Sequence, residues 1–203
     1  MLEFVRILHD GLAKADIAGI LNEVNIIDFN YDRSLEQVLF YTLKYSYGVS
    51  DQDVASALSN MRIIHPYGYL GKLAWQDAHL GLLGLPFGGE LHGPTDIPAV
   101  AERIKTFYEQ LHDEGDLSAM KSAVLEAERI VFLGFGFHPQ NVNMLRPNLR
   151  QGATTKVTRI YATAFGESPG GCDVIKQSVV AAMGNQIINV TGQIHVRAIA
   201  ESW

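Results

Sequence analysis

Cysteine is nearly absent from this 203-residue chain, which contains Cys172 alone. A single thiol excludes an internal disulfide framework and any site built from several thiolates, so we expect a reducing, cytoplasmic compartment. Clusters of basic residues are also missing from the sequence. The 16 Lys and Arg are outnumbered by 22 Asp and Glu, which gives a net charge of -6. A phosphate backbone attracts clustered positive charge, so we expect no nucleic-acid partner.

Long apolar runs and internal repeats are missing too. The first ten residues mix Glu3, Arg6 and Asp10 with apolar side chains, which is typical of neither a signal peptide nor a membrane span. The chain carries enough apolar residues for one sizeable core and is too short for two ordinary domains. The sequence therefore predicts a single domain over residues 1–203 without membrane association.

Helical and strand-like segments alternate along the chain. Apolar spacing predicts helices near residues 2–21, 35–43, 51–61, 97–110, 117–127, 141–149 and 174–183, and short apolar runs predict strands near 24–29, 62–65, 130–133, 157–164 and 186–190. We expect Asp32 or Ser34 to cap the second helix and Gly115 to separate the fourth from the fifth. About residues 66–96 are predicted to be a loop-rich insertion. This alternation favours an α/β fold, a Rossmann-like open parallel sheet with helices on both faces.

Polar and glycine residues follow three of the predicted strands. Asn30 and Asp32 come after the first strand, His65 after the second, and Gly134 and Gly136 after the third. Ligands of open parallel sheets bind at the carboxyl ends of the strands, so we expect these residues to line one cleft. Each also has a structural interpretation, as a helix cap, a hydrogen-bonded core histidine or a packing turn.

Three segments, taken in order, resemble one family. They are Phe29-Asn30-Tyr31-Asp32, His65-Pro66-Tyr67-Gly68, and Phe132-Leu133-Gly134-Phe135-Gly136-Phe137 with Asn141. They resemble the successive motifs of sirtuin-like NAD-binding domains, in particular the divergent bacterial branch associated with NAD-consuming enzymes. The resemblance covers about residues 24–164.

The resemblance implies roles for the residues that match. Asn30 and Asp32 would hold the nicotinamide and ribose end of NAD and help to position a water, with His65 as the candidate base. Gly134, Phe135 and Gly136, followed by Asn141, would contact the adenosine side. NAD is therefore the expected ligand, and hydrolysis of its nicotinamide–ribose bond is the implied reaction.

Two departures from the family pattern concern the histidine and the phosphate loop. The family's catalytic histidine directly precedes a glycine, whereas Tyr67 precedes Gly68 here, and a literal His92-Gly93 pair occurs in the glycine-rich stretch. No glycine-rich strand–loop–helix unit precedes Asn25, so the fold is expected to be incomplete at its N-terminal end. Without the backbone donors of that loop, we expect residues 1–203 to hydrolyse NAD weakly or not at all.

Three interpretations of the function therefore stay open. The first is a sirtuin-like NAD-binding protein that acts as a glycohydrolase. The second is a truncated or degenerate sirtuin-like module without catalysis, which acts in nucleotide binding or assembly. Its partner would be another copy of the chain, in a homo-oligomer, or a missing N-terminal segment. The third is an α/β domain for another small ligand. One cysteine cannot supply the four zinc thiolates of deacetylating sirtuins, so we expect no zinc, no other metal and no protein deacetylation.

Overall fold

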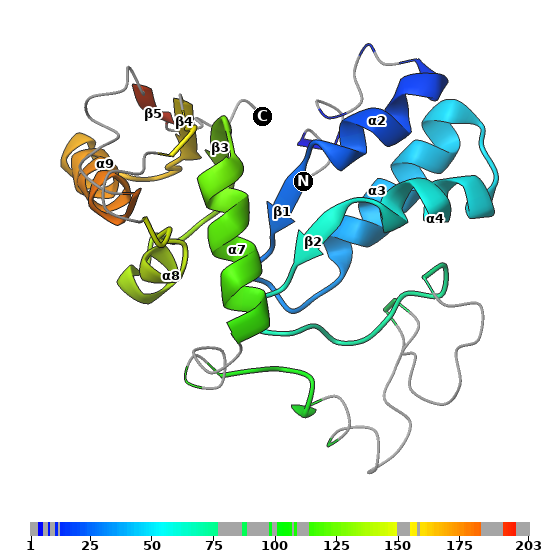
Figure 1. Ribbon diagram of the computed structural model, residues 1–203, viewed down its shortest axis with the longest axis horizontal. Helices are drawn as coiled ribbons and strands as arrows, with labels where there is room; N and C mark the ends of the chain where they lie inside the picture. Colours follow the sequence, from blue (N-terminus) through cyan, green and yellow to red (C-terminus); the bar gives the residue numbers. More distant parts are fainter. Residues whose placement is uncertain are drawn as a thin grey trace. The chain divides into compact units, whose positions relative to one another are not determined.

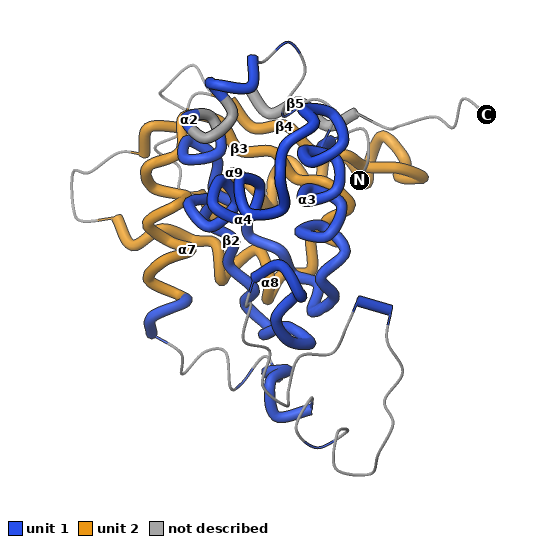
Figure 2. Tube along the Cα trace, turned by 90° about the vertical axis from the view of Figure 1, so that its right-hand side faces the viewer, with its two compact units in different colours: residues 1–116 blue, residues 117–203 orange. Residues whose placement is uncertain are grey.

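The computed structural model describes residues 4–5, 8, 11, 13–76, 87–88, 98, 101–106, 108, 114–149, 155–157, 159–183 and 193–197. Helices alternate with parallel strands in these residues, which confirms the predicted α/β class. The chain separates into two compact units, residues 1–116 and 117–203, coloured in Figure 2 and each described by itself. Within the described part, no helix is long and apolar enough to cross a membrane.

The first unit is built around a parallel strand pair. The strands β1 (Asn25–Ile27) and β2 (Arg62–Ile64) lie side by side in Figure 1, with Ile26 opposite Ile63. Parallel neighbours need a long crossover, which is provided here by two helices. These are α3 (Ser34–Tyr47) and α4 (Asp51–Ser59), and the elements before β1 are the short 3-10 helix η1 (Lys14–Asp16) and α2 (Ile17–Asn22).

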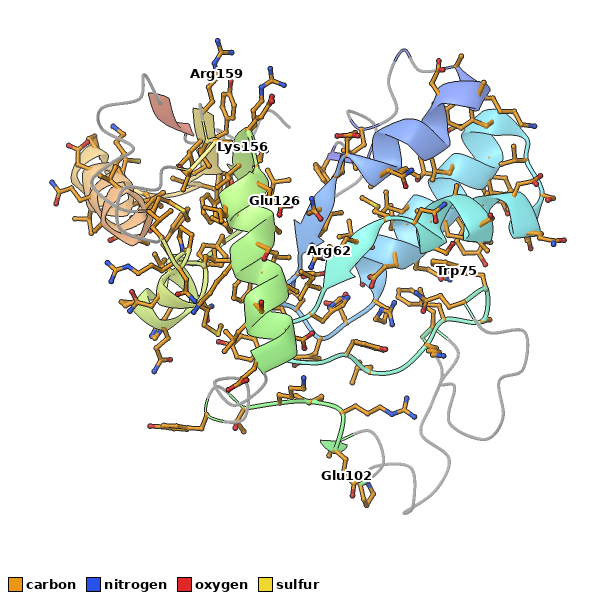
Figure 3. The ribbon with its side chains drawn as sticks, in the orientation of Figure 1. Arg62, Trp75, Glu102, Glu126, Lys156 and Arg159 are labelled. Atoms are coloured by element: carbon orange, nitrogen blue, oxygen red, sulfur yellow. The ribbon has the colours of Figure 1, made fainter. Side chains whose placement is uncertain are left out.

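The core of the first unit forms along one face of α3. Leu35, Leu39 and Leu43 recur every fourth residue, so a helix places them on one side, and all three are buried. Trp75, labelled in Figure 3, stacks on Phe40 of α3 with ring centroids 4.9 Å apart. The segment that follows β2 is therefore packed onto the same helix. The buried cluster consists of Val5, Leu21, Leu35, Leu39, Phe40, Leu43, Val54, Leu58 and Met61.

The start of α3 differs from the expected cap. Its N-cap residue is Arg33, whose side chain makes no capping bond, and Ser34 is already helical. Asp32 Oδ1 accepts a hydrogen bond from the Ser34 backbone N–H at 2.8 Å. Of the two predicted caps, Asp32 therefore supplies the acceptor at this helix end, and the Ser34 alternative is wrong.

The second unit contains a three-stranded parallel sheet in the order β3-β4-β5. The strands are β3 (Arg129–Phe132), β4 (Arg159–Thr163) and β5 (Gln193–Arg197), with Ile160 opposite both Ile130 and Ile194. The helices are α7 (Glu114–Glu126), whose first turn precedes the unit boundary, α8 (Pro139–Met144) and α9 (Pro169–Met183). The buried side chains of these elements include Met120, Val124, Phe132, Val142, Met144, Ile160, Ile175, Val179 and Met183.

Several predicted element boundaries are wrong. Gly115 lies inside α7 and does not separate two helices. The helix predicted over 97–110 does not extend through 102–106, where Ile104 pairs with Gly68 and the Lys105 N–H donates to the Tyr67 carbonyl. These bonds to a distant segment replace the helical ones. α8 begins and ends earlier than the predicted 141–149, at Pro139–Met144, and Pro147 disfavours a helical residue before it.

The predicted strands near 130–133 and 186–190 differ in how the structure describes them. The all-apolar run 130–133 is typical of a buried parallel strand, but Val131 of β3 is 53% exposed, so the strand is not buried on both faces. β3 is an edge strand among the described strands of its sheet, and its exposed residues Arg129 and Val131 alternate with the more buried Ile130 and Phe132. The strand predicted over 186–190 lies outside the described residues.

Candidate functional site

Asn30 lies on the turn that leaves the carboxyl end of β1. The Asp28 N–H still donates to the Ile64 carbonyl at 2.9 Å, so the strand pairing holds the start of this turn. Asp28 Oδ1 then accepts from both the backbone N–H and the side-chain Nδ2 of Asn30, each at 3.0 Å. Asn30 is exposed, and its amide is oriented by a short-range Asx interaction.

His65 follows β2 directly and contacts the Asn30 turn. Its Nδ1 lies 3.0 Å from the main-chain oxygen of Asn30, and its Nε2 lies 2.7 Å from Glu36 Oε1. A carbonyl oxygen can accept only, so Nδ1 carries a proton and donates it to Asn30. A hydrogen bond between Nε2 and the Glu36 carboxylate likewise requires a proton between these two atoms. The imidazole thus ties the two strand ends together and is itself buried.

Glu36 and Arg33 form a buried ion pair behind His65. Glu36 Oε1 also accepts from Arg33 Nε at 2.8 Å, while Glu36 Oε2 is buried and has no partner among the described residues. Arg33 donates further to the Gly71 carbonyl at 2.7 Å and to Gln76 Oε1 at 3.0 Å. The guanidinium carbon lies 4.4 Å from the centre of the Tyr69 ring, in cation–π geometry.

The sequence interpretation missed Glu36 and Arg33. The signal that could have found Glu36 is its place beside Leu35 and Leu39 on the apolar side of the predicted helix. A charged residue on a core face requires a buried partner, because an unpaired charge in an apolar interior is very unfavourable.

The charges of this cluster shift one another's pKa values. Burial alone would raise the pKa of Glu36, but the hydrogen bond from His65 and the charge of Arg33 hold it below its ordinary range. Burial alone would lower the pKa of His65, but the hydrogen bond and charge of Glu36 raise it above its ordinary range. Burial raises the pKa of Asp28. The pair Glu36 and His65 therefore favours carboxylate and imidazolium.

Three of these side chains bring metal-ligand atoms together. One atom each from Asp28, Glu36 and His65 lies within 4.8 Å of the others. A cation would have to replace the proton on His65 and compete with the Arg33 guanidinium for Glu36. As arranged, these residues fit a hydrogen-bonded ion-pair network better than a metal centre.

The remaining predicted site residues lie on the Asn30 turn, in the second unit or outside the described residues. Asp32 is half-buried on the Asn30 turn. Gly134, Phe135, Gly136 and Asn141 belong to the second unit, so one cleft shared with Asn30 stays a prediction. His92 and Gly93 lie outside the described residues.

The turn after β3 has its own local organisation. The Gly134 N–H donates to Thr163 Oγ1 of β4 at 2.9 Å, so this amide already has an acceptor. The rings of Phe132, Phe135 and Phe137 pack on one another with centroids 5.1–5.4 Å apart. A Cβ added at Gly136 would meet open space, so no protein contact requires glycine there.

Comparisons with protein-family models, with curated proteins and with solved structures found no match.

Proposed function

We propose that this chain is a sirtuin-like NAD-binding protein whose Asn30 turn receives the nicotinamide–ribose end of NAD and supports slow hydrolysis of the bond between them. One observation carries the proposal. Asn30 is exposed at the carboxyl end of a parallel strand pair, with its side-chain N–H held by Asp28 and its main-chain carbonyl held by His65. This is the edge at which α/β sheets bind ligands. With its Nδ2 bonded to Asp28, the Asn30 side chain keeps its oxygen as an acceptor for a hydrogen bond from a ligand or a water.

The reaction breaks the bond between ribose C1′ and the nicotinamide nitrogen. Nicotinamide leaves with the bonding electron pair, positive charge develops on the ribose ring, and water adds to C1′ and releases a proton. In this proposal Asn30 Oδ1 accepts a hydrogen bond from the attacking water and orients it. Asp32, on the same turn, contacts the nicotinamide end, as the family resemblance implies.

His65 has a different role in this proposal from the base that the resemblance implies. Both ring nitrogens face acceptors of the protein, the Asn30 carbonyl and the Glu36 carboxylate. A ring engaged in this way has no lone pair to receive the proton of water. His65 therefore holds Asn30 in place, and the proton released by water passes to bulk solvent.

The adenosine side of NAD is proposed to contact the turn at Gly134, Phe135 and Gly136, with Asn141. Open space at the Cβ positions of both glycines supports close approach of a ligand to the backbone. We further propose that the two parallel sheets belong to one Rossmann-like open sheet with helices on both faces, which would bring the two turns to one edge. The single cysteine supports a cytoplasmic location.

Calorimetry with NAD and with ADP-ribose tests binding, and chromatography of nicotinamide over hours, with protein in excess, tests cleavage. Asn30→Ala should abolish nicotinamide release. The matched control is Asn60→Ala, since Asn60 is an exposed asparagine at the end of α4, and it should leave release unchanged.

Each outcome decides between interpretations. Absence of binding for both ligands would refute the NAD proposal. Binding without nicotinamide release would favour the non-catalytic module. Release that survives Asn30→Ala would remove Asn30 from the reaction.

A further inference from the structure

The ion pair of Glu36 and Arg33 has no role in the ligand contacts proposed above. Glu36 is 1% exposed and lies in the first turn of α3 among apolar side chains. A buried ion pair contributes little net stability compared with apolar residues of similar size, because removing both charges from water is costly. Its position directly behind His65 points to a different use.

A continuous chain of hydrogen bonds connects Arg33 to the exposed turn. Arg33 Nε donates to Glu36, the same carboxylate oxygen faces His65 Nε2, and His65 Nδ1 donates to the carbonyl of Asn30. Ionised Glu36 keeps a proton on Nε2 and fixes the plane of the ring. The ring in turn fixes the backbone from which the Asn30 amide projects.

We propose that Glu36, oriented by Arg33, is the positioning residue of this site and acts through His65 to hold Asn30 in the geometry that water attack requires. The proposal rests on the proposed function. Arg33 also binds Gly71 and Gln76, so the same ion pair links the segment after β2 to the Asn30 turn.

This arrangement has a pH signature. The groups that face His65 are Asp28 on the turn after β1, Glu36 in the first turn of α3, and the Tyr69 ring, whose centroid lies 5.4 Å from that of the imidazole. Arg33 is bonded to the same Glu36 oxygen and so acts on His65 through Glu36. When His65 loses a proton, Nε2 presents a lone pair to the Glu36 carboxylate and the two repel. The hold on Asn30 then weakens, so cleavage of NAD should decline as pH rises through the pKa of His65.

The first experiment compares the full chain with Glu36→Gln, which keeps the shape of the side chain and removes its charge. Nitrogen-15 NMR follows the His65 ring and the Asn30 side-chain amide across pH, and nicotinamide release gives kcat and KM. We expect a lower His65 pKa, a shifted Asn30 amide signal, and a kcat reduced by about a hundredfold at nearly constant KM, as for ~1 Å misplacement of a reacting group. The control is Glu23→Gln, at an exposed glutamate of the same unit, and it should change none of these quantities.

An unchanged His65 pKa, or a lowered His65 pKa with an unmoved Asn30 amide, would overturn the proposal. If Glu36 has only a structural role, the lower kcat of Glu36→Gln would be accompanied by a raised KM and an unchanged pH profile. That result would also overturn the proposal. If wild type does not release nicotinamide, the proposed function fails, while the two NMR signals still decide whether Glu36 positions Asn30.

A second measurement tests the proposal if the Glu36→Gln protein does not fold. In the wild type alone, the Asn30 amide signal should titrate with the same pKa as the His65 ring. Arg33→Lys keeps the charge but loses the planar donor fork, so it should lower the pKa of His65, as Glu36→Gln does. An Asn30 signal that ignores the titration of His65 would refute the positioning role.

Discussion

His65 Nε2 lies 2.7 Å from Glu36 Oε1, and both side chains are buried where water cannot replace either partner. The two residues come from different elements, the end of β2 and the first turn of α3. Their contact therefore joins the strand pair to the crossover helix at the place where the exposed Asn30 turn begins.

Removing the carboxylate should strongly destabilise the protein. Glu36→Ala leaves Arg33 and His65 without their shared partner, and breaking a buried ion pair on one side costs about 3–5 kcal/mol. Urea unfolding followed by circular dichroism measures the change. Glu23→Ala, at an exposed position, should stay within about 0.5 kcal/mol of wild type. A loss below 1 kcal/mol for Glu36→Ala, roughly that of a surface pair, would contradict the buried ion pair.

Stability should depend on pH in a defined window. The pKa of Glu36 is held below its ordinary value, so its contribution is present above about pH 4.3 and is lost as pH falls through the folded-state pKa. The pKa of His65 is raised, so its contribution is present below about pH 6.5 and is lost as pH rises through the folded-state pKa. The pair therefore adds most stability between about pH 4.3 and 6.5. Urea midpoints of wild type and Glu36→Gln across pH should differ most in that window, and parallel curves would refute the linkage.

Gly68 should not tolerate a side chain. It has φ of +73°, and an added Cβ would collide with the carbonyl oxygen of Arg103, whose neighbour Ile104 pairs with Gly68. Gly68→Ala therefore combines left-handed strain of about 1–2 kcal/mol with a backbone clash. Gly48→Ala is the matched control, since Gly48 has φ of +57° and open space around its Cβ position. Thermal unfolding should show a larger loss for Gly68→Ala, and equal losses would contradict the close approach of the two segments.

The core of the second unit can be tested on one helix. Val179 of α9 is 1% exposed and Val174 is 62% exposed. Val179→Ala removes buried methyl groups and should cost about 1.5–3 kcal/mol. Val174→Ala should be neutral or slightly stabilising, because the helix propensity of alanine is more favourable than that of valine by roughly a few tenths of a kcal/mol. Urea unfolding distinguishes the two, and the opposite order would show that α9 buries its other face.

Much of the local structure was predictable because it depends on neighbours in the sequence. The spacing of Leu35, Leu39 and Leu43 predicted α3 and its buried face, and the runs near 24–29 and 62–65 predicted two strands that the structure confirms as parallel. The positions of Asn30 and His65 directly after those strands followed from the same reasoning. The helix predicted over 97–110 failed at 102–106, where backbone bonds to Tyr67 and Gly68 outweigh local helical preference.

The sequence by itself determined the alternation of helices and strands and placed polar residues after the strands, since hydrophobic periodicity and turn chemistry act over a few residues. Only the tertiary structure decided that Glu36 and His65, 29 positions apart, form a hydrogen bond, and that Arg33 reaches Gly71 and Gln76, 38 and 43 positions away. Such bonds have no local signal, because a side chain selects a distant partner only after packing has buried both and excluded the water that would otherwise solvate them.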